Sequence, residues 1–128
     1  MSSLAENAIL LLLRQLFEHE EILYLPSQTV TMNGDSENIP LIVRFGEILV
    51  FHLDVTSVSG TNPTLDLFID IQDPLSRKWV NQDKFPTVTS VTTLALALPV
   101  RSTKYRVRWV LGGTNTSFTF SVGVVIIK

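Results

Sequence analysis

The chain has no cysteine and only two histidines among its 128 residues. Without cysteine there is no disulfide framework, no thiolate nucleophile and no cysteine-based metal site. The two histidines, His19 and His52, lie far apart and form no H-x-x-x-H or H-E-x-x-H spacing. We therefore expect no enzyme activity and no cofactor, and we assign no catalytic, cofactor-binding or metal-binding residue.

Charged residues are also scarce, at 17% of the chain against a typical ~25%. The net charge is −2, so there is no basic excess to attract nucleic-acid phosphates. The longest uninterrupted apolar run is Ala8–Leu13, whereas a membrane span needs about 20 residues. The composition argues against nucleic acid and membrane as partners. Because 45% of this small domain is hydrophobic, we expect part of its surface to be hidden in an assembly.

The N-terminal stretch predicts an α-helix. Ser3 and Glu6 have the spacing of a capping box, and the Leu-rich run that follows predicts a helix over about Leu4–Glu20. Its apolar stripe is broader than one core face needs, so the helix can pack on its own domain or against another subunit. Membrane-surface binding is disfavoured because the polar face is acidic. We divide the chain into an N-terminal helix or arm, 1–25, and a β-sandwich domain, 26–128.

The remainder of the chain alternates polar and apolar residues in short runs separated by turn residues. About eight such runs occur at the spacing of an antiparallel sandwich, so we predict an all-β fold of jelly-roll type with an N-terminal α-helix. The clearest example is Lys104–Lys128, where two alternating runs flank a Gly-Gly-Thr-Asn cluster. We interpret this segment as a β-hairpin.

The turn of that segment has an earlier counterpart. Gly60-Thr61-Asn62 is followed by an alternating run, and Gly113-Thr114-Asn115 repeats the pattern 53 residues later. One repeat is too few for a solenoid or propeller. Either two hairpins use the same turn chemistry, or they lie side by side with both turns on one rim.

Two acidic residues share a strand face. Asp66 and Asp70 lie about 13 Å apart at the rise of a strand, which exceeds the spacing of glycosidase carboxylates. Alternation places Arg106 and Arg108 outward as well, so cross-strand ion pairs are expected. These residues predict a polar sheet face rather than a catalytic pair.

The other polar and aromatic candidates are weaker. His52 and Asp54 share a strand face, which favours a surface pair over a catalytic dyad because no nucleophile accompanies them. Trp109 falls in register with apolar neighbours and is expected in the core. Trp79 is the better candidate for an aromatic platform that binds sugar.

The end of the chain is apolar on both faces of the expected strand, at Val124–Ile127. An edge strand of this kind would promote aggregation, so we expect the N-terminal helix or a neighbouring subunit to cover it. The candidate interface residues are Ile9, Leu12, Leu13, Leu16, Phe17, Val125 and Ile127.

Two segments carry a resemblance to a known group of proteins. VTSVSGTNPTLDLFIDIQDPLSRKWV (Val55–Val80) and YRVRWVLGGTNTSFTFSVGVVIIK (Tyr105–Lys128) resemble small structural proteins of tailed-phage virions. The resemblance covers about two-thirds of the chain, Val43–Lys128, and Thr116 stands where the pattern has proline. It implies a capsid or tail component without catalysis.

These observations predict a cement or decoration protein of an icosahedral phage capsid. We expect a homotrimer that binds the major capsid protein at the capsid surface of the virion, because several weak contacts add through effective concentration. Two alternatives stay open: a tail or neck structural component, and a carbohydrate-binding or adhesin module.

Overall fold

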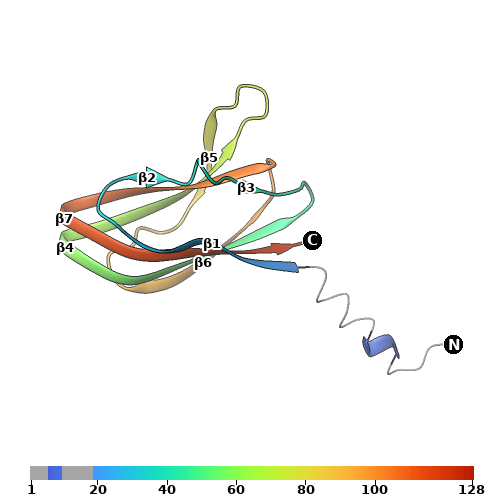
Figure 1. The fold of residues 1–128 in the computed structure, drawn as a ribbon, viewed down its shortest axis with the longest axis horizontal. Helices are drawn as coiled ribbons and strands as arrows, with labels where there is room; N and C mark the ends of the chain where they lie inside the picture. The colour runs from blue at the N-terminus through green and yellow to red at the C-terminus, as the bar shows by residue number, and fades with distance from the viewer. Residues whose placement is uncertain (1–5, 10–18) are drawn as a thin grey trace.

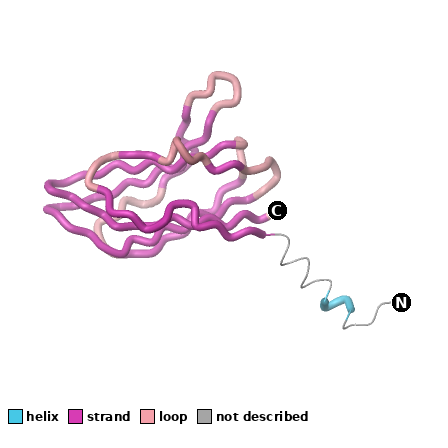
Figure 2. The backbone as a smooth tube through the Cα atoms, in the orientation of Figure 1, coloured by secondary structure: helices cyan, strands magenta, loops and turns pink. Residues whose placement is uncertain are grey.

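A computed structural model describes residues 6–9 and 19–128, and almost all of them are in β-strands (Figures 1 and 2). Glu6–Ile9 is helical. The strands are β1 (His19–Val30), β2 (Gly34–Asp35), β3 (Leu41–Ile42), β4 (Ile48–Gln72), β5 (Trp79–Lys84), β6 (Thr92–Pro99) and β7 (Lys104–Ile127). The predicted all-β class is confirmed, but several of the predicted short runs are joined into two long strands.

The central feature is the pairing of β4 with β7, which are antiparallel along nearly their whole length. The register runs from Ile48 opposite Ile127 to Ile71 opposite Tyr105. Halfway along, both strands turn back together, at the end of the molecule where Figure 1 labels them. The result is a two-stranded ribbon folded in half.

This folded ribbon corrects the predicted hairpin at Lys104–Lys128. The segment is a single strand, β7, and both of its halves pair with β4. The turn chemistry was recognised correctly, but the strand beyond the turn pairs with another part of the chain. The alternative in which the two Gly-Thr-Asn turns share one rim is confirmed, since Thr61 pairs with Thr114.

Folding the ribbon brings two layers face to face. In the first layer the order is β6, the first half of β4, the second half of β7, then β1. In the second it is β5, the second half of β4, the first half of β7, then β2 and β3. By hydrogen bonding, the strands form one continuous open antiparallel sheet. The jelly-roll topology stays a prediction, which this layer order favours.

The core lies between the layers and contains the alternate residues of both long strands. Phe51 of the first layer meets Tyr105 of the second, with ring centroids 6.3 Å apart. Trp109 packs edge-on against Phe120 at 5.8 Å, so the prediction that Trp109 lies in the core is confirmed. Aromatic pairs in these arrangements add about 0.5–1.5 kcal/mol beyond the area that they bury.

The described N-terminal residues agree only partly with the predicted helix. Glu6–Ile9 is helical, whereas His19 and Glu20 are already in β1, so the predicted end of the helix at Glu20 is wrong. β1 also crosses the division at residue 25, and register shifts on both sides of Leu25 accommodate Pro26, which has no N–H to donate. Leu12, Leu13, Leu16 and Phe17 lie outside the described residues.

The rim where the ribbon turns depends on close backbone approach at Gly113. This residue has φ of +97°, and a methyl group there would lie 2.5 Å from the carbonyl oxygen of Asn62. Gly46 also has positive φ, +89°, but a methyl group there would meet nothing within 4 Å. Comparing substitutions at Gly46 and Gly113 therefore separates the free-energy cost of the positive-φ conformation from the cost of the steric clash.

We predict that Gly113→Ala destabilises the domain far more than Gly46→Ala. The left-handed conformation costs about 1 kcal/mol at Gly46. At Gly113 the backbone clash raises the loss to about 3 kcal/mol or more, because the neighbouring strand must move. Urea denaturation of both variants measures the difference. Equal losses would show that the rim does not require the close approach.

Candidate interaction surface

The outward side of the first layer is apolar near the end of the chain. Cross-strand partners face the same way, so Ile48 and Ile127 form one outward pair and Val50 and Val125 the next. Ile48 and Ile127 are exposed, and Val50 and Val125 are half-buried. Leu23 of β1, 65% exposed, extends this surface. We call these residues the outer apolar face: Leu23, Ile48, Val50, Val125 and Ile127.

A shallow depression of about 290 Å³ lies in this face at Gly123. Gly123 pairs with His52 on one side and Leu23 on the other, and both of these residues are exposed. A methyl group at Gly123 would meet nothing closer than the Ile22 carbonyl oxygen, at 3.7 Å. The missing side chain therefore forms the floor of the depression.

The structure places two candidate interface residues, Val125 and Ile127, on the outer apolar face, and their role as an interface stays a prediction. Val124 and Ile126 point into the core instead, so alternation explains half of this apolar segment. The expectation of an edge strand is wrong, because β7 lies between β1 and β4. Sequence reasoning missed Leu23, Ile48 and Gly123, because the registers of β1 and β4 on β7 decide their position.

A groove of about 550 Å³ lies at the end of the sandwich and exposes two apolar side chains among the charged residues Glu20, Arg44, Glu47 and Lys128. Phe45 is 68% exposed there, and Ile42 is also exposed. An ion pair between Lys128 and Glu20 borders the groove and lowers the pKa of the Glu20 carboxyl. We call Ile42 and Phe45 the end patch.

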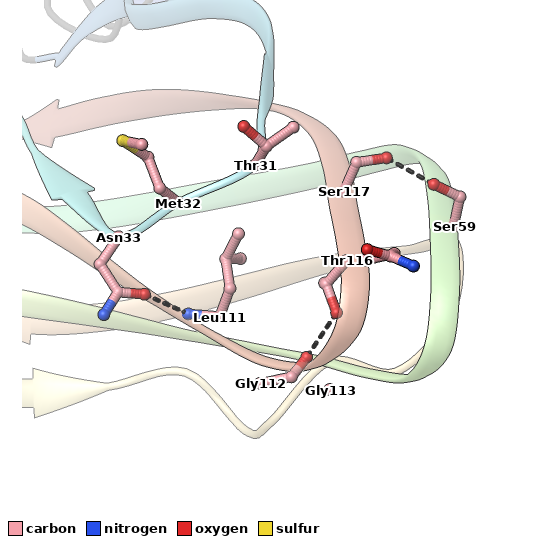
Figure 3. A pocket seen from close by; sticks show the side chains of 10 residues that line it. Thr31, Met32, Asn33, Ser59, Leu111, Gly112, Gly113, Thr116 and Ser117 are labelled. Carbon is pink, nitrogen blue, oxygen red and sulfur yellow. Dashed lines mark hydrogen bonds between the residues drawn. The ribbon is translucent and has the colours of Figure 1, made fainter.

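The rim at the opposite end carries a groove of about 670 Å³ that is polar but uncharged (Figure 3). Asn33 accepts a hydrogen bond from the backbone N–H of Leu111 at 2.8 Å, and Thr116 donates to the carbonyl oxygen of Gly112 at 2.7 Å. The hydroxyls of Ser59 and Ser117 are bonded at 2.6 Å. These contacts join the segment before β2 and the two turning strands, so their evident role is to hold the rim.

The outward side of the second layer is charged, as the sequence predicted. Buried Asp70 accepts hydrogen bonds on Oδ2 from the Nε atoms of Arg106 and Arg108, both at 2.9 Å. Its other oxygen, Oδ1, has no hydrogen-bond partner among the described residues. Arg108 lies over the ring of Phe68 at 4.1 Å. The single carboxylate of Asp70 thus pairs with two guanidinium groups, which cover it from solvent.

Trp79 is built into the same charged surface. Its indole N–H donates to Glu37 at 3.1 Å, and the Arg106 guanidinium lies 4.8 Å from the ring centroid. Arg106 also reaches Glu37 at 3.4 Å. One face of the ring and its polar hydrogen are therefore used by the chain's own side chains.

Asp66 forms a separate and more exposed pair on this layer. Lys84 lies 2.8 Å from its carboxylate, and Thr87 donates a hydrogen bond at 2.6 Å. Hydrogen bonds from Lys84 and Thr87 hold the pKa of Asp66 below its ordinary value. Asp66 and Asp70 thus have different partners and do not act as a pair.

His52 and Asp54, which share a strand face, have different surroundings. Asp54 accepts a hydrogen bond from Thr93 at 2.9 Å. His52 lines the depression at Gly123. Over residues 6–9 and 19–128, no three His, Asp or Glu side chains gather as metal ligands, and no helix is long and apolar enough to cross a membrane.

Comparison with known proteins identifies no family for this chain. No protein-family model matches the chain, and no curated protein sequence matches it.

We predict that Asp70→Asn is much more destabilising than Asp66→Asn. Removing the charge of Asp70 takes the shared carboxylate from two partly buried guanidinium groups, a loss of roughly 2–4 kcal/mol. Arg106 keeps Asp35 and Glu37 nearby, so the loss falls mainly on Arg108. The pair of Asp66 with Lys84 is partly solvated, so its loss costs less than about 1 kcal/mol. Urea denaturation at neutral pH compares the two. A larger loss for Asp66→Asn would contradict this ranking.

We also predict that acid removes the contribution of Asp66. Because its pKa is lowered on folding, the stabilisation is present above the unfolded value of about 3.9 and is lost as pH falls through the folded value. The difference in unfolding free energy between wild type and Asp66→Asn should therefore shrink between pH 5 and the acid limit of folding, roughly pH 2. A constant difference would show that ionisation is not its source.

Proposed function

We propose that this chain is a non-enzymatic virion structural protein, a cement or decoration protein at the surface of an icosahedral phage capsid. The observation that carries the proposal is exposed apolar surface in two places, the outer apolar face and the end patch. Solvent-exposed apolar side chains gathered on one surface favour a protein partner. A cement protein needs two such surfaces, one toward its own copies and one toward the capsid.

The resemblance of Val55–Val80 and Tyr105–Lys128 to tailed-phage virion proteins supports the choice of partner. A small cement protein gains affinity when several copies act together, because each further contact benefits from effective concentration. Three copies around a capsid threefold position satisfy closed symmetry. We assign the end patch to the major capsid protein, since Phe45 is a large aromatic anchor of the type that dominates interfaces.

The carbohydrate-binding alternative and the tail or neck alternative would use different surfaces of the molecule. A carbohydrate-binding module would use Trp79, but Arg106 covers one face of that ring and Glu37 takes its N–H. A sugar would have to compete with these contacts. A tail or neck component would use the same apolar surfaces as a capsid protein, so only the location in the virion separates the two.

We predict that the purified protein co-sediments with capsids of its own virus from which it has been stripped. Phe45→Asp should weaken binding at least tenfold, or about 1.4 kcal/mol, because it places a charge in an apolar contact. Leu75→Asp is the control, since Leu75 is 93% exposed in the turn between β4 and β5.

Three results would contradict the proposal. Wild-type protein that does not bind stripped capsids removes the capsid role. Protein found only in purified tails favours the tail or neck component. Binding on a glycan array that is lost in Trp79→Ala favours the carbohydrate-binding module.

A further inference from the structure

The outer apolar face contains the depression at Gly123, which can hold one aliphatic side chain and which we call the seat. The depression above Gly123 is bordered by Leu23, His52 and Val125. Its edges are strands held by the β1, β4 and β7 ladder, so the shape is fixed before any partner arrives. A rigid seat of this kind reduces the ordering cost of association.

The chain's own N-terminal arm does not fill this seat with the residues that the structure describes. All of Glu6–Ile9 is exposed, and Ile9 is 56% exposed. Figure 1 draws this helix beyond the end of the sandwich, away from both layers. An apolar side chain is thus presented to solvent outside the body, while an apolar seat stays open on it.

We propose that the outer apolar face binds the N-terminal arm, residues 1–18, of a second copy of this chain, with Ile9 or a neighbouring aliphatic residue seated above Gly123. The proposal rests on the self-association included in the proposed function and names its surface. The arm precedes His19, which pairs with Ile127 at the border of the face.

The contact joins unlike surfaces, an arm of one copy and a face of the next. Such heterologous contacts form a ring when the rotation closes. Each copy in the ring gives one arm and receives one, so no face is left uncovered. A ring of three agrees with the trimer expected at a capsid threefold position.

A complementation experiment tests the exchange in the full-length chain. Leu23→Asp damages the face and leaves the arm intact, whereas Ile9→Asp damages the arm and leaves the face intact. Each variant alone should lose association at least tenfold. An equimolar mixture should regain mixed pairs, because an intact arm from one variant meets an intact face on the other. Mass by analytical ultracentrifugation is the readout, and Val80→Asp, at a residue 51% exposed on β5, is the control.

A second variant tests the seat itself. Gly123→Leu fills the depression without a backbone clash, since a methyl group there would meet nothing within 3.7 Å. It should reduce association at least tenfold while leaving the melting temperature of the dissociated chain unchanged. Normal assembly of Gly123→Leu and Leu23→Asp would overturn the proposal.

Three other outcomes would also overturn it. If Ile9→Asp associates normally while Leu23→Asp does not, the face contacts the same face of another copy rather than an arm. If each variant fails alone and the mixture also fails, the arm and the face are not the two halves of one contact. If the wild-type protein is monomeric at high concentration, no copy binds another through this surface. Capsid binding and its loss in Phe45→Asp are measured separately, so a failure here leaves the proposed function standing or falling on its own result.

Discussion

The pairing of β4 with β7 is the constraint on which the rest of the structure depends. Every other strand pairs with one of these two, so the ribbon that they form is the frame of both layers. Because the ribbon folds in half at its rim, each long strand contributes to both sides of the core. Most contacts are therefore distant in sequence, and the loop-closure entropy of joining Ile48 to Ile127 is large. The rim joins the two layers, because both long strands pass through it.

The outer faces of the two layers differ in the side chains that they expose. On the second layer, Asp70 and two arginines form a paired charged surface that Trp79 and Phe68 help to cover. On the first layer, the outward positions near the end of the chain are mainly aliphatic, and His19 and Glu21, which lie 3.5 Å apart, border them on β1. Charged groups of this kind resist unwanted sheet contacts, whereas an aliphatic surface favours association. We expect the asymmetry to direct the proposed self-association to the first layer.

Sequence analysis correctly predicted features that depend on the alternation of side chains along a strand. It did not predict features that depend on which strands pair. Alternation placed Trp109 in the core and Asp70 beside Arg106 correctly, since both follow from which face a residue occupies. The same pattern could not reveal which strand lies next to Lys104–Lys128, because turn chemistry is local and the partner is not. The exposed positions of Leu23 and Ile48 required two registers at once. Neither register can be read from a short stretch of sequence, so sequence analysis could not identify this part of the candidate surface.

The buried carboxylate of Asp70 also helps to fix the register of β4 on β7. A slip of one residue between β4 and β7 would place Asp70 and the arginines on opposite faces. A slip of two would keep the faces but separate Asp70 from one of its two arginine partners, which weakens the buried pairing. The same slips would move Gly113 away from Asn62, where only glycine fits. The Asp70 charge and the rim therefore select one register of β4 on β7, and that register aligns Ile48 and Val50 with Ile127 and Val125 on one apolar face.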